Sequence, residues 1–221
     1  MSDVELRVEA DAEAAAATVA SLLVEARGDV VLTGGSTPGR AYELAADRRA
    51  DWSEVELWWG DERCVPPDDD RSNYGLARRT LLDRVERLGP VHRIQGELGP
   101  GPAASAYDAE LRGRSLELML LGLGSDGHVA SLFPNAPALD ETERLAVPAE
   151  AGLEPFVDRV TVTLRAIAAA QLVVFLVSGE EKAEPARRAF AEPPERATPA
   201  SLARGRRTFA VLDAAAASLL N

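Results

Sequence analysis

The chain has 221 residues, 46% of them hydrophobic and 27% charged, which is enough for one sizeable α/β domain with a buried core. A net charge of −12 argues against a nucleic-acid-binding surface, and no apolar run is long enough to cross a membrane. The charged N-terminus shows no signal peptide, and the single cysteine, Cys64, is compatible with a reducing compartment. We therefore expect one cytoplasmic domain over residues 1–221, with no nucleic-acid or membrane partner.

The hydrophobic pattern alternates between strands and helices along most of the chain, which indicates an α/β fold. Short apolar or alternating runs predict strands, and longer segments with a capping residue and one apolar face predict helices. The predicted strands are residues 4–8, 30–33, 55–59, 91–94, 116–121, 159–164, 172–178 and 204–212. The predicted helices are residues 11–26, 36–49, 72–85, 103–111, 165–170, a helix opening near residue 180, and residues 213–220. Residues 134–152 show no clear strand.

The stretch from residue 116 to residue 134 contains the strongest functional signal. A buried strand ends at Gly122, and a glycine-rich turn then presents Ser125, Asp126 and His128. Ligands of open α/β sheets bind outside the carboxyl ends of the strands. A titratable pair at such a place is therefore a candidate functional site.

Gly122, Gly124 and Gly127 also match the G-x-G-x-x-G fingerprint of dinucleotide-binding proteins. That fold needs a long helix after the third glycine, whereas Pro134 and Pro137 leave room for at most about two helical turns. We therefore expect no nicotinamide or flavin site.

A second glycine-rich turn, Gly34-Gly35-Ser36-Thr37, follows the predicted strand at residues 30–33. Ser36 or Thr37 can cap the next helix, whose free N–H groups and positive dipole end would face a ligand. The turn therefore predicts an anion site, with an ordinary strand-to-helix connection as the alternative. It is not a nucleotide-binding P-loop, because the G-K-[ST] ending is absent.

Charged residues follow two further predicted strands. Asp61 and Arg63 lie in the segment Gly-Asp-Glu-Arg after residues 55–59, which is either an active-site loop or a solvated charge cluster. Lys182 follows residues 172–178 and is the only lysine among the 24 lysine and arginine residues. Arginine does not replace lysine where a compact point charge is needed, so Lys182 is a candidate anion ligand, with a chance surface lysine as the alternative.

The two histidines and the one cysteine lie far apart in the sequence and give no metal-ligand spacing. We therefore expect no metal site, and we interpret His92 as a structural residue.

The chain resembles the 6-phosphogluconolactonase family in four segments, which occur in the order and spacing of that family. They are LTGGSTPGRAYELA, WWGDERCVPPDDDRSNYGLARRTLL, LLGLGSDGHVASLFP, and RVTVTLRAI followed by LVVFLVSGEEKAE. The likeness covers nearly the whole chain, and DGHxASLFP together with GDER and SNY is specific. The family resembles glucosamine-6-phosphate deaminase in fold, which implies a modified doubly wound, mostly parallel sheet flanked by helices.

The resemblance implies hydrolysis of 6-phospho-D-glucono-1,5-lactone to 6-phosphogluconate in the oxidative pentose phosphate pathway. A lactone is an activated ester, so water and one base suffice without metal or cofactor. His128 is the expected base, because imidazole titrates near neutrality, and Asp126 is expected to orient it or the ligand. We expect a monomer in which the substrate and its phosphate meet Gly34, Gly35, Ser36, Thr37, Asp61, Arg63 and Lys182. Backbone N–H groups near Gly35 or Gly124 are candidate donors to the oxyanion.

Two other functions remain open. The first is a glucosamine-6-phosphate deaminase-type isomerase, whose pattern has glutamate and tyrosine where this chain has Phe133 and Arg63. The second is a non-catalytic sugar-phosphate sensor. Such regulators carry a DNA-binding module, for which the residues before the first buried strand leave no room. Departures from the lactonase pattern are mild: Asn135 replaces a usual glycine, and FAVLD lacks a usual tryptophan.

Overall fold

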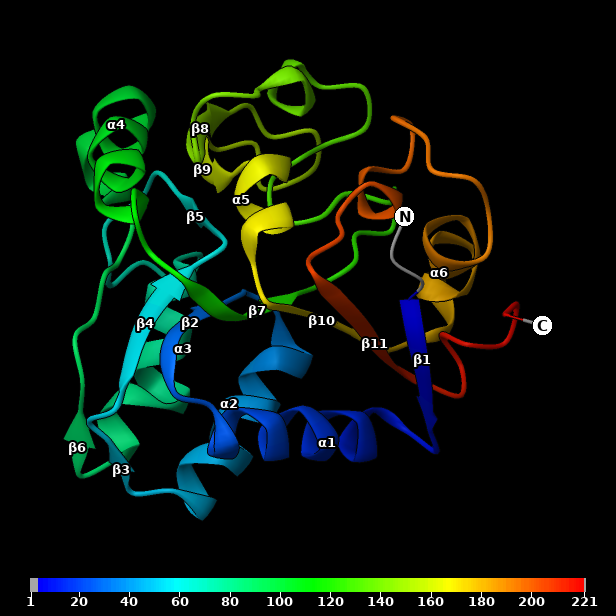
Figure 1. The fold of residues 1–221 in the computed structure, drawn as a ribbon, viewed down its shortest axis with the longest axis horizontal. Coiled ribbons are helices and arrows are strands. Elements are labelled where there is room, and N and C mark those ends of the chain that lie inside the picture. The colour runs from blue at the N-terminus through cyan, green and yellow to red at the C-terminus, as the bar shows by residue number, and fades with distance from the viewer. Residues whose placement is uncertain (1–3, 221) are drawn as a thin grey trace.

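The computed structural model describes residues 4–220, and its centre is a six-stranded sheet in which every neighbouring pair of strands is parallel (Figure 1). The strand order is β1-β11-β10-β7-β2-β4. The first strand therefore lies at one edge, as its alternating sequence predicts, and β7 lies inside the sheet. The strands are β1 (Val4–Glu9), β2 (Gly28–Leu32), β4 (Val55–Trp59), β7 (Leu116–Leu121), β10 (Leu172–Val177) and β11 (Arg207–Asp213).

Helices cover both faces of this sheet. In Figure 1, α1 and α2 lie below it, whereas α4, α5 and α6 lie above it. The helices are α1 (Ala12–Glu25), α2 (Ser36–Arg48), α3 (Asn73–Thr80), α4 (Pro100–Leu111), α5 (Leu164–Ala169) and α6 (Ala183–Phe190). Covering helices explain why β2, β7 and β10 are near-continuous apolar runs rather than alternating ones. In residues 4–220, no helix combines the length and apolar character needed to cross a bilayer.

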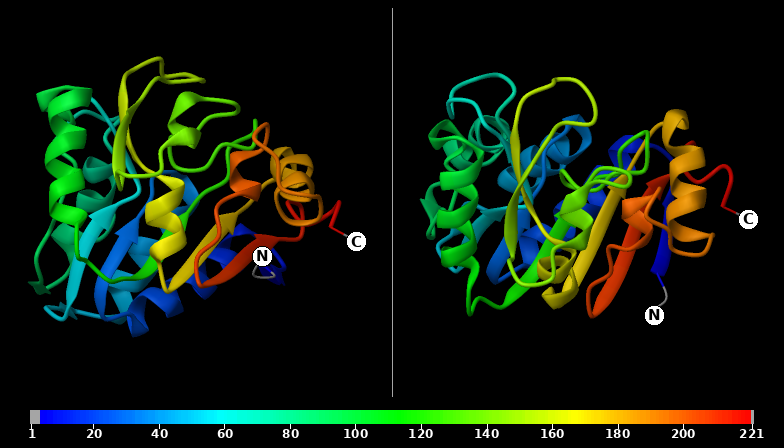
Figure 2. Two further views of the ribbon diagram at one scale, coloured as in Figure 1. Left: turned by 45° about the horizontal axis from the view of Figure 1, so that its top comes forward. Right: turned by 90° about the horizontal axis from the view of Figure 1, so that it is seen from above.

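A three-stranded antiparallel sheet lies beside the carboxyl end of β4. Its order is β5-β9-β8, and β5 begins one residue after β4 ends. The left view of Figure 2 shows β8 and β9 rising above the central sheet. This small sheet joins segments that are far apart in the chain, namely β5 (Asp61–Arg63), β8 (Ala146–Ala149) and β9 (Arg159–Val162). A separate two-stranded sheet pairs β3 (Asp51–Trp52) with β6 (Arg87–Leu88).

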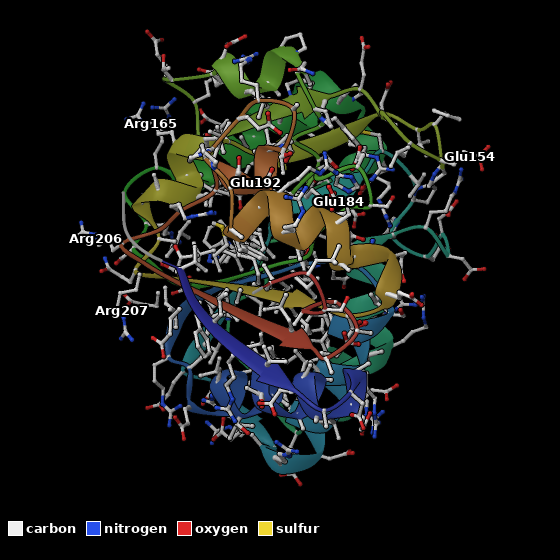
Figure 3. The ribbon with its side chains drawn as sticks, turned by 90° about the vertical axis from the view of Figure 1, so that its right-hand side faces the viewer. Glu154, Arg165, Glu184, Glu192, Arg206 and Arg207 are labelled. Carbon is white, nitrogen blue, oxygen red and sulfur yellow. The ribbon has the colours of Figure 1, made fainter. Side chains whose placement is uncertain are left out.

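The direction of the strands determines where a ligand can bind. Figure 3 views the molecule from the β1 edge, with Arg206 and Arg207 at the amino end of β11. Glu154 lies on the opposite side, in the loop between β8 and β9. That opposite side is the carboxyl-end rim of the parallel sheet, where the glycine-rich turns after β2 and β7 also lie.

Local sequence decides most element ends. The side chain of Asp11 accepts a hydrogen bond from Ala14 N (2.8 Å), as expected for the cap of α1. Pro100 suits the first helical position, so α4 begins three residues before the predicted start. The helix predicted over residues 72–85 is wrong beyond Thr80, where a short 3₁₀ turn at Leu82–Arg84 follows.

Four other predictions are wrong. Residues 213–220 form turns rather than a helix, because a short isolated alanine-rich segment gains too little from propensity alone. Residues 91–94 contribute only an isolated bridge between Leu57 and Val91. Residues 61–63 are a strand rather than a loop, and β8 lies in the segment without a predicted strand. Both strands are short, and β8 contains Pro148, so neither has a recognisable alternating pattern.

Candidate active site

A cavity of about 240 Å³ lies at the carboxyl-end rim of the central sheet. Its walls come from the turns after β2 and β7, from β5 and β9, and from the segment after β10. The residues expected at the site that line this cavity are Gly34, Gly35, Asp61, Arg63, His128 and Lys182. Ser125, which the glycine-rich turn presents beside His128, also lines it, and lining residues that the sequence analysis did not select include Thr33, Asn73 and Arg159.

Ser36 and Thr37 line a neighbouring cavity of about 500 Å³, which shares Gly35 and Lys182 with the first. The predicted hydroxyl cap of α2 is wrong. Gly35, with φ of 110°, is the cap residue, and no side chain caps the helix. The Thr37 hydroxyl instead forms a hydrogen bond of 2.7 Å with the hydroxyl of Ser178. The helix N-terminus thus faces the second cavity with free N–H groups and with Lys182 beside it.

His128 is held by Asp126, two residues before it. Asp126 Oδ1 accepts hydrogen bonds from His128 Nδ1 (2.6 Å) and from the His128 backbone N–H (3.0 Å). Burial favours a higher pKa for Asp126, but the two hydrogen bonds from His128 outweigh it and lower the pKa of this carboxyl. The ionised carboxylate thus fixes the tautomer with a proton on Nδ1, which leaves Nε2 free to accept one. Asp126 itself does not line the cavity.

The turn around His128 requires glycine at position 124. A Cβ atom on Gly124 would lie 2.0 Å from His128 Nδ1, where no atom fits. Gly124 N also donates to the carbonyl of His128 (2.9 Å), so this N–H, one of the two suggested oxyanion donors, is already engaged. In residues 4–220, the N–H of Gly35 donates to no protein acceptor, so Gly35 is the better candidate of the two.

Asp61 is a buried carboxylate at the wall of the cavity. It is 5% exposed, and its Oδ2 accepts a hydrogen bond of 2.6 Å from the hydroxyl of Ser131. The amide of Asn73 donates to its Oδ1 (3.1 Å) and to its backbone carbonyl (2.9 Å). These donors fix the carboxylate on the site side of β5.

Glu62 points to the opposite side of β5, because side chains alternate along a strand. Its carboxylate accepts from the N–H groups of Arg63, Asn73 and Tyr74 and from the hydroxyl of Ser72, at 2.7–2.9 Å. Burial raises its pKa, although these hydrogen bonds oppose the shift. Glu62 thus anchors the N-terminus of α3 to β5 and has a structural role.

We expect Glu62→Gln to lower the free energy of unfolding by about 1–3 kcal/mol, because an amide cannot accept at both of its polar atoms. The matched control is Glu86→Gln, at an exposed glutamate, which should change stability by less than about 0.5 kcal/mol. Urea unfolding followed by tryptophan fluorescence measures both. Equal stability of the two variants would contradict the structural role of Glu62.

Arg63 and Arg159 are direct cross-strand partners in the β5–β9 register, and both line the cavity. In residues 4–220 neither forms an ion pair with a carboxylate, and the Nε atom of each is buried without a hydrogen-bond partner. Burial lowers the pKa of Arg159. The nearby charge of Asp61 opposes this shift, and the smaller effect of the Arg63 charge adds to it. Like charges directly opposite on paired strands destabilise a sheet. Two unpaired guanidinium groups in a protein of net charge −12 therefore fit an anionic ligand.

Lys182 completes the positive side of the site. It lies in the short 3₁₀ segment Glu180–Lys182 after β10 and lines both cavities. Its ammonium forms no ion pair with any residue from 4 to 220. A carboxylate-oriented imidazole and three unpaired cations thus meet around one cavity, which can activate water beside an anionic group.

Comparison with known proteins identifies the family of this chain. The family model described as glucosamine-6-phosphate isomerases/6-phosphogluconolactonase matches residues 3–211. The chain is 40% identical to the 6-phosphogluconolactonase of Streptomyces coelicolor, over 95% of this chain and 90% of that protein. It is 26% identical to the solved structure of 6-phosphogluconolactonase from Trypanosoma brucei, with a TM-score of 0.86 over the whole of both chains.

A monomeric glucosamine-6-phosphate deaminase shares the fold, with a TM-score of 0.87 at 16% identity over 98% of this chain and all of that one. The fold is therefore the mostly parallel, helix-flanked sheet that the sequence resemblance predicts. From the family match and the extent of the similarity, this chain belongs to the glucosamine-6-phosphate isomerase/6-phosphogluconolactonase family.

Proposed function

We propose that this chain hydrolyses 6-phospho-D-glucono-1,5-lactone to 6-phosphogluconate, a step of the oxidative pentose phosphate pathway. The observation that carries the proposal is His128, whose free Nε2 faces a cavity that also holds three unpaired cations. Relatives named 6-phosphogluconolactonase at 40% and 38% identity support it. We further propose that residues 1–221 act as one cytoplasmic, monomeric domain on this small molecule, with no nucleic-acid or membrane partner.

In the proposed reaction, His128 is the general base. Its Nε2 takes a proton from a water molecule, and the resulting hydroxide attacks the lactone carbonyl carbon. The tetrahedral oxyanion accepts a hydrogen bond from the Gly35 N–H. When the bond from this carbon to the ring oxygen breaks, the imidazolium returns its proton to the leaving oxygen. Asp126 stabilises the imidazolium, because it remains hydrogen-bonded to Nδ1 throughout.

The substrate is positioned by its charged end. Arg63, Arg159 and Lys182 neutralise the phosphate dianion, and the Ser36–Thr37 end of the turn adds backbone N–H groups, which leaves the Gly35 N–H for the oxyanion. The contacts to the phosphate keep the lactone carbonyl within reach of His128, so the binding interactions also orient the reacting groups. Asp61, which the Ser131 and Asn73 side chains hold in place, accepts a hydrogen bond from a sugar hydroxyl.

The test is the decay of 6-phosphogluconolactone with and without the protein, measured as formation of 6-phosphogluconate. Catalysis well above the spontaneous rate supports the proposal. A deaminase would instead release ammonia from glucosamine 6-phosphate. A sensor would bind 6-phosphogluconate without accelerating lactone decay, and either result would refute the lactonase.

We expect EDTA to leave the activity unchanged. Among residues 4–220, no group of three or more histidine, cysteine or acidic side chains is placed to hold a metal ion. The measurement is the lactonase rate after dialysis against EDTA, with and without added divalent ions. Complete loss of the rate, restored by one of these ions, would contradict a metal-free mechanism and point to Asp61, Asp126 and His128 as ligands.

A further inference from the structure

Phe133 contacts two functional side chains of the site, His128 and Arg159, and has no polar side-chain atom of its own. Its ring centroid is 4.8 Å from that of His128, with the two planes inclined by 43°. The guanidinium of Arg159 lies over the same ring, 5.6 Å from its centroid. Phe133 is 4% exposed, so both contacts are shielded from water. One aromatic ring thus contacts both the proposed base and one of the unpaired arginines.

Few other contacts orient the Arg159 guanidinium. Its Nε is buried without a partner, and within residues 4–220 the guanidinium forms one hydrogen bond, from Nη2 to the carbonyl of Pro155, which is long at 3.3 Å. The Phe133 ring is therefore a major part of what fixes the direction of this guanidinium.

The ring itself is held by the loop between β8 and β9. A Cβ atom on Gly152 would lie 2.7 Å from Phe133 Cδ1, so the loop backbone packs directly on the ring. Next to this contact, Phe133 also lines a cavity of about 600 Å³ with Pro134 and Pro148. The ring therefore has space to move, and its position depends on the Gly152 contact.

We propose that Phe133 is a positioning residue that couples the base to the phosphate site, by holding the Arg159 guanidinium and by stabilising the His128 imidazolium through its ring. The proposal rests on the proposed function for the role of both partners. The physical basis is the negative face of an aromatic ring, which attracts cations. The ring thus favours the protonated state of His128 that forms when water is deprotonated, and the same ring aligns Arg159 on the phosphate.

The experiment replaces Phe133 with leucine, which keeps an apolar side chain and removes the ring. The chain offers a matched control in Phe190→Leu. The Phe190 ring packs on Phe175 (5.2 Å) and under the guanidinium of Arg204 (5.9 Å), and it lines neither site cavity. Both variants should retain the far-ultraviolet circular dichroism of the parent.

The first readout is the proton NMR titration of the imidazole rings, of which the chain has only two. In Phe133→Leu the midpoint for His128 should move to lower pH by about 0.4–1 unit, and that for His92 should not move. The charged groups that share the site with His128 are Asp126, Asp61, Arg63, Lys182 and Arg159. The variant leaves the first four unchanged, and the same titration in an Arg159→Gln background separates the effect of the ring from that of a displaced Arg159. Phe190→Leu should leave both midpoints in place.

The second readout is the affinity for 6-phosphogluconate. Phe133→Leu should weaken it about two- to tenfold. In an Arg159→Gln background the same substitution should change it less than twofold, because the two residues act through one contact. Gly152→Ala should shift the His128 midpoint and weaken the affinity in the same direction but by less, because the added Cβ displaces the Phe133 ring without removing it.

Neither readout needs turnover, so the result for Phe133 is independent of the lactonase assay on the parent protein. A His128 midpoint and a 6-phosphogluconate affinity that match those of Phe190→Leu would overturn the proposal. So would an affinity loss of the same size with and without Arg159.

Discussion

His128→Ala should lose most of the catalysed lactonase rate, by about 10²- to 10⁴-fold, as expected for the removal of a general base. The fold should persist, because the imidazole is partly exposed and, among residues 4–220, its ring forms a hydrogen bond with Asp126 alone. Affinity for 6-phosphogluconate should also persist, since the cations that meet the phosphate are untouched. The measurement is kcat on 6-phosphogluconolactone, corrected for spontaneous decay.

The matched control for this variant is His92→Gln, at the other histidine. His92 stacks on Trp58 at 3.9 Å and forms a hydrogen bond of 3.0 Å with Glu56, and it does not line the cavity. Its replacement should leave kcat within about twofold of the parent value, because His92 contacts none of the residues that line the cavity at which the reaction is proposed. If His128→Ala keeps more than about a third of the parent rate, the loss is less than tenfold and another group is the base.

Lys182→Ala should weaken the binding of 6-phosphogluconate about ten- to a hundredfold, because a charge-assisted contact contributes about 1.5–3 kcal/mol. The ammonium has no ion-pair partner in residues 4–220, so its removal leaves no protein group uncompensated. Lys182→Arg should restore only part of the affinity, since a planar guanidinium is bulkier than the point charge it replaces. Calorimetric titration measures all three proteins.

The control for Lys182 is the substrate without its phosphate. Gluconolactone should be hydrolysed about equally poorly by the parent and by Lys182→Ala, because the lost contact is to the phosphate. Unchanged affinity of Lys182→Ala for 6-phosphogluconate would make Lys182 a surface residue. The phosphate site would then consist of Arg63, Arg159 and the Gly34–Thr37 turn.

Local patterns account for the part of the fold that the sequence predicts correctly. The apolar runs of β2, β7 and β10 are recognisable because both of their faces are buried. The elements that prediction missed lack such a signal. β5 has only three residues, all of them charged, so its sequence is typical of a loop, and β8 contains a proline.

Chain order also explains which cavity residues could be selected beforehand. Gly34, His128 and Lys182 each follow a buried parallel strand, and parallel strands bring their carboxyl ends to one rim. Position after a recognisable strand was therefore enough to group them. Arg159 begins a strand instead of following one, so the same reasoning passes over it.

The sequence pattern alone determined that this protein has an α/β fold with an Asp126–His128 pair after a central strand, and the resemblance to the 6-phosphogluconolactonases implied the type of sheet. The pattern suffices for the strands, the helices and the pair because each depends on residues close together in the chain. Only the tertiary structure decided that Arg159 pairs with Arg63 across two strands, that Glu62 turns away to anchor α3, and that Phe133 contacts both His128 and Arg159. Each of these depends on the antiparallel pairing of β5 with β9 or on loop packing, and long-range contacts of that kind leave no periodic trace in the sequence.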